Sequence, residues 1–168
     1  MTKEAFMEVT IVSGLEHPEE IVALFSEYTK MLVEVEPSFA GYLEQQNYQH
    51  EIEDLPYKYG PQVGGVLHLA LVDGKPVGCI GLRKLDETRC EMKRLYVLPE
   101  YRKHKLGDRL VQRILQDARE LGYKQMLLDT LPQLDSAIRL YQRHGFDFIP
   151  CYNDSPVEST LFMGKELE

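Results

Sequence analysis

Tryptophan is absent from this sequence of 168 residues, and cysteine is scarce. Cys79, Cys90 and Cys151 form an odd set without CxxC spacing, so the chain does not have the pattern of a disulfide scaffold. The five histidines show no HExxH or other ligand spacing. We therefore expect free thiols in a reducing compartment and no bound metal.

Long apolar runs are also missing. No stretch approaches the length needed to cross a bilayer, and the first nine residues lack the basic and then apolar order of a signal peptide. Hydrophobic residues make up 43% and charged residues 27% of the chain, which suits one globular core. We expect a single domain over residues 1–168, cytoplasmic and not associated with membranes.

Basic residues are the minority, with 19 Lys and Arg against 27 Asp and Glu and a net charge of −8. Such a charge repels nucleic acid and favours a cationic or neutral partner. The basic residues are unevenly placed, however, and six fall within twelve positions: Arg102, Lys103, His104, Lys105, Arg109 and Arg113. This local cluster indicates either a site for a small anion or a solvated helix face.

Apolar periodicity predicts the secondary structure. Residues recur at helical spacing over 18–35, over 106–121 before Gly122, and around 137–141 before Gly145. Strands are predicted over 8–12, 66–72, 77–85, 90–97, 126–129, 146–152 and 159–165. Residues 38–59 are polar and aromatic without a firm period, and we interpret them as a short helix and loops. The order of elements predicts an α/β (α+β) fold, in which helices pack on a mixed sheet.

A tight loop over residues 98–107 joins a predicted strand to a predicted helix. A helix N-terminus offers unpaired backbone N–H groups and the positive end of the helix dipole, which together bind phosphate oxygens. Arg102, Lys103 and Lys105 would add charged contacts. The loop is therefore a candidate diphosphate site.

Two motifs resemble those of the GNAT acetyltransferases. The first is Leu95-Tyr96-Val97-Leu98-Pro99-Glu100-Tyr101-Arg102, followed by Leu106-Gly107 and Leu110. The second comprises Ala137, Leu140-Tyr141 and Gly145-Phe146. The resemblance implies one domain with a mixed, mostly antiparallel sheet of six to seven strands, helices on both faces and a central splay between two strands. It also implies transfer of an acetyl group from acetyl-CoA to a primary amine of a small molecule, peptide or protein, by direct attack in a ternary complex.

The resemblance also implies a set of cofactor-binding residues. Leu95 and Val97 would offer backbone groups to the pantetheine arm, and the backbone N–H groups of residues 102–107 would take the diphosphate. The set is Leu95, Tyr96, Val97, Arg102, Lys103, His104, Lys105, Leu106, Gly107 and Asp108. Two positions depart from the family pattern: Lys105 replaces a loop glycine, and Leu134 stands where the family often places asparagine.

Tyr141 and Glu91 are the candidate catalytic residues. Tyr141 lies where the resemblance places the acid that protonates the coenzyme thiolate, although a tyrosine on an amphipathic helix is also typical of a core position. Glu91 is six residues before Val97, and by strand alternation shares a face with Lys93, Leu95 and Val97.

Partial desolvation would raise the pKa of Glu91 and suit a general base. A salt bridge to Lys93 or Arg83, and substrate binding without proton transfer, remain alternatives for this residue. The backbone N–H of Val97 is the candidate oxyanion donor. His68 on the strand 66–72 ranks below Glu91 as a residue of the acceptor cleft.

Two further expectations concern activity and assembly. An alternative to an active enzyme is a CoA-binding sensor or interaction module, in which the altered loop has cost the domain its catalysis. The two terminal strands leave a sheet edge through which a homodimer could form. The sequence does not identify the acceptor amine.

Overall fold

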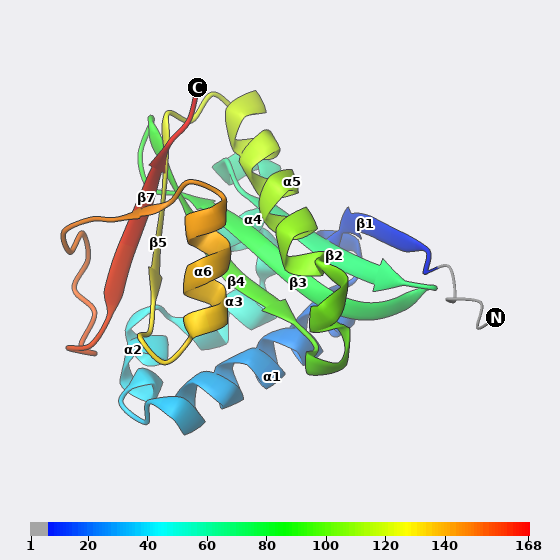
Figure 1. Ribbon diagram of the computed structural model, residues 1–168, viewed down its shortest axis with the longest axis horizontal. Helices are drawn as coiled ribbons and strands as arrows, with labels where there is room; N and C mark the ends of the chain where they lie inside the picture. The colour runs from blue at the N-terminus through cyan, green and yellow to red at the C-terminus, as the bar shows by residue number, and fades with distance from the viewer. Residues whose placement is uncertain (1–6) are drawn as a thin grey trace.

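The strands found among the described residues, 7–168, form one seven-stranded mixed sheet in the computed structural model (Figure 1). The strands are β1 Val9–Ser13, β2 Val66–Val72, β3 Lys75–Lys84, β4 Arg89–Val97, β5 Gln125–Thr130, β6 Asp147–Phe148 and β7 Leu161–Glu166. Their order across the sheet is β1-β2-β3-β4-β5-β7-β6. Strands β4 and β5 are parallel and the other pairs are antiparallel, which confirms the predicted mixed, mostly antiparallel sheet.

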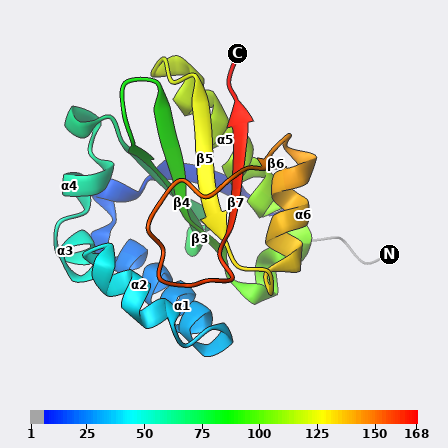
Figure 2. The ribbon, with the colours of Figure 1, turned by 90° about the vertical axis from the view of Figure 1, so that its left-hand side faces the viewer.

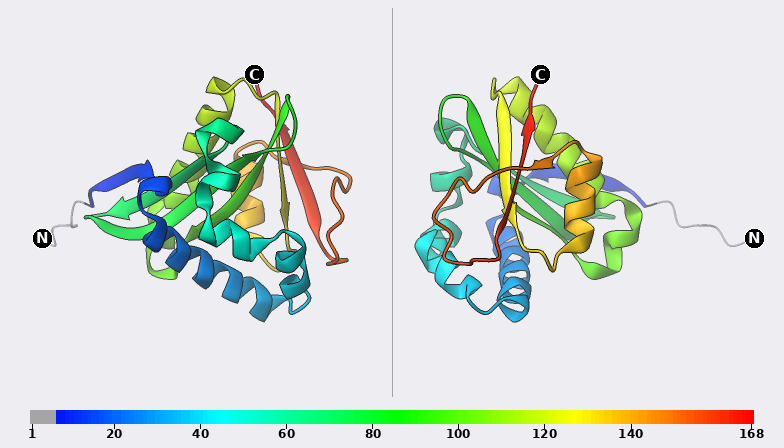
Figure 3. Two further views of the ribbon diagram at one scale, coloured as in Figure 1. Left: turned by 180° about the vertical axis from the view of Figure 1, so that it is seen from behind. Right: turned by 60° about the vertical axis from the view of Figure 1, so that its left-hand side comes forward.

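The helices cover both faces of the sheet. They are α1 Pro18–Val35, α2 Phe39–Gln45, α3 Tyr48–Glu53, α4 Leu55–Tyr59, α5 Leu106–Glu120 and α6 Asp135–Arg143, with short 3-10 helices η1 Gly14–Glu16, η2 Pro61–Val63 and η3 Pro99–His104. Helices α5 and α6 pack on one face (Figure 2). Seen from behind, α1 to α4 cross in front of the strands on the other face (Figure 3).

Helix α5 shows how the sequence builds the larger core. Its apolar residues recur on one face and are buried against β2, β3 and β4, as the periodicity predicts. Leu110, in the middle of this face, is 0% exposed. Truncating a leucine at such a site costs about 2–5 kcal/mol of stability, because the cavity does not close fully. Gly122, at φ +89°, follows the helix in the left-handed conformation that suits glycine.

Two sequence predictions differ from the structure. The strand predicted over 146–152 is wrong beyond Phe148, because β6 contains only Asp147–Phe148. Pro150 follows closely and cannot donate a backbone hydrogen bond to a strand ladder. Residues 38–59 form three short helices, α2 to α4, where one helix and loops are predicted. The described helices include none with both the length and the apolar composition needed to cross a membrane.

Candidate functional site

Strands β4 and β5 separate part of the way along the sheet. Only residues 89–91 of β4 pair with residues 125–127 of β5. Beyond that point, the side of β4 that faces β5 has no partner strand among residues 7–168. The N–H of Leu98 donates to the carbonyl of Val77 on β3 at 2.8 Å. Because successive backbone N–H groups of a strand point to opposite edges, the N–H of Val97 points towards the open side. This is the splay that the family resemblance implies.

A β-bulge in β4 lies at the splay. Lys93 pairs with Gly81, and Tyr96 pairs with Cys79. Two residues of β4, Arg94 and Leu95, therefore lie opposite the single β3 residue between Cys79 and Gly81. Arg94 adopts φ +58°, a left-handed conformation that is uncommon for a residue with a side chain. The extra residue shifts the alternation of side chains between the two faces of the sheet.

The shift corrects the predicted placement of Glu91. Leu95 and Val97 pack with Cys90 and Met92 in the core beneath α5. The side chain of Lys93 instead reaches Gln46, beyond α2 on the opposite face, and contacts Glu91 there. The expectation that Glu91 and Lys93 share a face with Leu95 and Val97 is therefore wrong, because regular alternation ends at the bulge.

A long cleft runs from the splay along the ends of α5 and α6. We call it the long cleft and define it by the residues that line it: Tyr28, Met31, Leu95, Tyr96, Val97, Arg102, Lys105, Gly107, Asp108, Gln133, Leu134, Asp135, Ser136, Ala137, Arg139, Leu140, Tyr141 and Arg143. The cleft thus connects the open edge of β4 with the beginnings of both helices.

The N-terminus of α5 opens into the long cleft. No side chain caps it, and the first turn of a helix leaves backbone N–H groups without intrahelical acceptors. Lys105, which replaces a glycine of the family pattern, precedes the helix at φ +56°, a left-handed conformation that favours glycine. A Cβ on Gly107 would lie 3.0 Å from Leu140 Cδ2, so the glycine permits close packing of α5 against α6.

The structure brings most of the predicted cofactor-binding residues together. Leu95, Tyr96, Val97, Arg102, Lys105, Gly107 and Asp108 line the long cleft. Lys103 and His104 are exposed on η3 and Leu106 is buried in the core, so their side chains lie outside it. Arg102 donates from Nε to the carbonyl of Val97 at 3.0 Å. Asp108 pairs with Arg143 at 3.3 Å and with His144 at 2.8 Å.

Tyr141 lies in the wall of the long cleft, on the last turns of α6. Its ring packs edge-on against Phe146 with centroids 6.0 Å apart, and it is 6% exposed. Burial raises the pKa of Tyr141 well above its usual value, and the nearby Tyr28 and Asp129 act in the same direction. The phenol therefore stays protonated at physiological pH.

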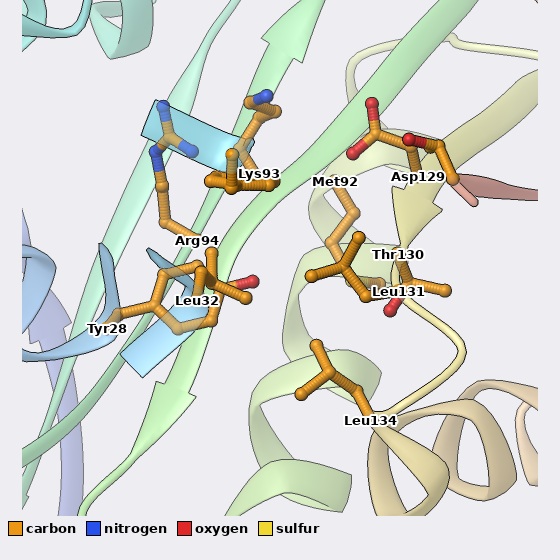
Figure 4. Close-up of a pocket in the computed structure, with 11 residues that line it drawn as sticks. Tyr28, Leu32, Met92, Lys93, Arg94, Asp129, Thr130, Leu131 and Leu134 are labelled. Atoms are coloured by element: carbon orange, nitrogen blue, oxygen red, sulfur yellow. The ribbon is translucent and has the colours of Figure 1, made fainter. Parts of the chain in front are cut away.

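A smaller cavity, the splay gap, lies where β4 and β5 separate. Its lining includes Tyr28, Leu32, Phe39, Met92, Lys93, Arg94, Asp129, Thr130, Leu131, Leu134 and Thr160. Figure 4 shows Lys93 extending from β4 and Asp129 from β5, with Met92 between the two strands. Tyr28 and Leu134 also line the long cleft, so the two spaces share part of their walls.

A third space, the polar pocket, adjoins the splay gap at Lys93. It is lined by Tyr42, Gln45, Gln46, Asn47, Tyr57, Lys58, Val63, Arg83, Lys84, Glu91, Lys93 and Asn153. Asn153, on the loop between β6 and β7, lines one side, and its neighbour Tyr152 contacts Glu91. Tyr152 donates to Glu91 Oε2 at 2.5 Å, and Asn153 Nδ2 donates to Asp129 Oδ2 at 2.9 Å.

Glu91 lies in the polar pocket and is 2% exposed. Burial alone would raise its pKa, but attraction to Lys93 and Arg83 and the hydrogen bond from Tyr152 outweigh burial and lower the pKa to about 2. The cationic nitrogen atoms paired with its Oε1 are Arg83 Nε at 2.8 Å and Lys93 Nζ at 3.7 Å. The expected rise in the pKa of Glu91 is therefore wrong, because the sequence did not show how closely both cations approach.

The bulge residue Arg94 anchors the opposite wall of the site. Its guanidinium donates from Nε to Glu51 Oε2 at 2.9 Å and from Nη2 to Glu51 Oε1 at 3.0 Å. Lys58 and Tyr59 donate to the same carboxylate at 2.6 and 2.8 Å. Helices α3 and α4 are thereby fixed to β4, which places Lys58 at the polar pocket.

Sequence reasoning missed two residues that line the splay gap. Asp129 enters the sequence prediction only as the last residue of the strand 126–129, although polar residues at the carboxyl end of a parallel strand are typical of ligand sites. Lys93 lies in a strand that also carries Arg89, Glu91 and Arg94, so its charge alone did not mark it as a site residue. His68 contacts Asp117 of α5 and lines none of the three spaces.

Within residues 7–168, no three His, Cys, Asp or Glu side chains gather as metal ligands would.

Comparison with known proteins identifies the family. The model of the acetyltransferase (GNAT) family matches residues 22–146. An uncharacterized N-acetyltransferase of Schizosaccharomyces pombe is 34% identical over 157 residues, which cover 93% of this chain and 94% of that protein. A second relative, an uncharacterized N-acetyltransferase of Dictyostelium discoideum, is 30% identical over 96% of this chain and 100% of that protein.

Solved structures agree in fold. A GNAT-family acetyltransferase from Staphylococcus aureus superposes with a TM-score of 0.78 at 22% identity, covering 96% of this chain and 100% of that one. PaiA N-acetyltransferase from Thermoplasma acidophilum, solved in complex with coenzyme A, gives a TM-score of 0.68 at 19% identity over 96% and 99% of the two chains. The family match and the whole-length relatives show that this chain belongs to the GNAT acetyltransferase family and is an acyltransferase.

Proposed function

We propose that the protein binds acetyl-CoA in the long cleft and transfers the acetyl group to a primary amine that enters through the polar pocket. One observation carries the proposal: the long cleft joins a helix N-terminus and a strand edge that have no cap and no partner strand among residues 7–168, and it shares Tyr28 and Leu134 with the splay gap. The complex of PaiA with coenzyme A, a protein of the same fold, supports this choice of ligand.

The residues of the long cleft fit the parts of the coenzyme. The N–H groups of Leu106, Gly107 and Asp108 would take diphosphate oxygens at the start of α5, where the helix dipole is positive. Lys105 would add a charged contact. The pantetheine arm carries amides, which can pair with backbone groups on the open side of β4, such as those of Leu95, in the manner of an added strand, while the N–H of Val97 is left for the thioester.

The reaction requires few groups from the protein. The neutral amine attacks the thioester carbonyl carbon, a C–N bond forms, and the C–S bond breaks. The N–H of Val97, directed to the open side of β4, would stabilise the negative charge that develops on the carbonyl oxygen. Tyr141 would give its phenolic proton to the sulfur and regain one from solvent, while the nitrogen loses the proton that balances the equation.

We assign Glu91 a positioning role in place of the general base. A carboxylate with a pKa of about 2 is a weak base, and two cations and Tyr152 already bind it. Its negative charge instead holds Arg83 and Lys93 at the polar pocket. Water near the amine is then the proton acceptor.

Two measurements test the proposal. Thiol release from acetyl-CoA is followed with a panel of primary amines, and CoA binding is measured separately by thermal shift, with ATP as the control. Acetylation of at least one amine and stabilisation by CoA but not ATP are expected, because a ligand stabilises the state that binds it.

The outcomes separate the proposal from its rivals. CoA binding without acetylation of any amine would contradict the enzyme and favour a CoA-binding sensor. Equal stabilisation by ATP would contradict the coenzyme specificity of the long cleft.

A further inference from the structure

Lys93 is a buried cation that has fewer hydrogen-bond acceptors around it than it has donors. It is 7% exposed and lines both the splay gap and the polar pocket. Among residues 7–168, its ammonium has one hydrogen-bond acceptor, Gln46 Oε1 at 3.2 Å, and its ion-pair partner Glu91 lies 3.7 Å away. An ammonium has three donors, and burying unused ones costs free energy. A ligand acceptor beside Lys93 would recover that cost.

The carboxylates nearby are already engaged to different degrees. Glu91 accepts from Arg83 through Oε1 and from Tyr152 through Oε2. Asp129 accepts both of its side-chain hydrogen bonds, from Tyr42 and Asn153, through Oδ2. Its Oδ1 therefore has no side-chain donor among the described residues and is available to an ammonium or amino group.

Lys93 and Asp129 stand on the two strands that separate at the splay (Figure 4). No ion pair joins them within residues 7–168, so each can take a separate ligand group. One strand thus offers a donor for a carboxylate, and the other offers an acceptor for an amine. A molecule with both groups close together would satisfy both residues.

We propose that the acceptor is a free α-amino acid, whose carboxylate binds Lys93 and whose amino group binds Asp129 beside the thioester. This inference rests on the proposed function and names its substrate class. Lys58, Arg83 and Lys84 on the same pocket lining pair closely with Glu51, Glu91 and Glu87, whereas the ammonium of Lys93 is 3.7 Å from Glu91, so we expect the ligand carboxylate at Lys93.

The charged residues that line the polar pocket favour a different acceptor from the one that the net charge of the chain favours. The whole chain carries −8 and would attract a cationic amine, but the polar pocket has four cationic side chains and one carboxylate in its lining. Tyr57 and Val63, 57% and 41% exposed at this pocket, would suit an apolar amino-acid side chain.

Matched acceptors test the substrate class. Acetylation rates are compared for the twenty standard amino acids and for two matched series: phenylalanine, phenylalaninamide and phenethylamine, and leucine, leucinamide and isoamylamine. We expect kcat/KM to be about 10- to 100-fold higher for a free amino acid than for its amide or decarboxylated amine, the usual effect of a hydrogen bond between charged groups. Equal or higher rates for the amides and plain amines would overturn the inference while leaving the acetyltransferase activity intact.

Variants assign the two contacts. Lys93→Met should remove the preference for the carboxylate, Lys93→Arg should restore part of it, and Asp129→Asn should raise KM for every amine. The control is Lys30→Met, an exposed position on α1 outside all three spaces. An undiminished carboxylate preference in Lys93→Met would overturn the inference.

A binding measurement keeps the inference separate from turnover. With CoA present, N-acetylphenylalanine and N-acetylphenethylamine are titrated into wild type and Lys93→Met by calorimetry. Tighter binding of the carboxylate compound to wild type alone supports the inference even if no amine is acetylated, and in that case the proposed function fails on its own. Equal binding of both compounds to wild type would contradict the inference.

Discussion

Glu51 provides the sharpest test of how the wall of the polar pocket is held. Its side chain is 0% exposed, and its carboxylate binds Arg94, Lys58 and Tyr59. Glu51→Gln keeps the shape but removes the charge opposite Arg94, whose side chain is 3% exposed. A guanidinium buried this deeply cannot lose its proton at ordinary pH, so the variant must hold it without its counter-ion.

The expected loss follows from that burial. Removing one partner of a buried ion pair costs about 3–5 kcal/mol, because the other charge stays desolvated. For a domain of this size, one kcal/mol lowers the melting temperature by about 2–4 °C, so the decrease should be about 6–20 °C. Urea denaturation at neutral pH measures the free energy of unfolding directly, and thermal melting checks it.

A neighbouring residue supplies the control. Glu53 is on the same helix but exposed, and Glu53→Gln makes the same chemical change without stranding a buried cation. Its free energy of unfolding should stay within about 0.5 kcal/mol of wild type. The double variant Glu51→Gln with Arg94→Gln should lose less than the sum of the single variants, since both partners are then neutral. Equal losses for Glu51→Gln and Glu53→Gln would refute the reasoning.

Three further predictions concern the long cleft and the polar pocket. Tyr141→Phe should lower kcat by about 10²- to 10⁴-fold with little change in the CoA dissociation constant; unchanged turnover would remove its role as acid. Glu91→Gln should lower activity by a factor that does not vary with pH. Recovery of activity at high pH would contradict the positioning role and indicate that Glu91 is the general base. Because the pKa of Glu91 falls from 4.5 to about 2 on folding, its stabilisation is complete above about pH 5 and fades as pH falls towards 2. The deficit in unfolding free energy of Glu91→Gln, followed by urea denaturation, should shrink over that range. Lys105→Gly should raise unfolding free energy by about 1 kcal/mol, because Lys105 has φ +56°, yet weaken CoA binding in calorimetry; unchanged affinity would exclude a charge contact.

The sequence by itself determined the elements whose pattern is local. The apolar periodicity of α5, the left-handed stop at Gly122 and the strand before Pro99 follow from side-chain spacing and backbone preference over a few residues. The loop motif between Val97 and Gly107 likewise predicted the cofactor end of the site, since a strand, a loop and a helix N-terminus are contiguous in the chain.

Only the tertiary structure decided the arrangement of the polar pocket, the proposed acceptor side. The bulge at Arg94 depends on how β4 pairs with β3, and it moved Glu91 and Lys93 to the face opposite Val97. The pKa of Glu91 depends on Arg83 and Tyr152, which reach it from another strand and from a distant loop. Pairing register and contacts across the sheet are set by the whole fold, so neither periodicity nor a short motif could specify them.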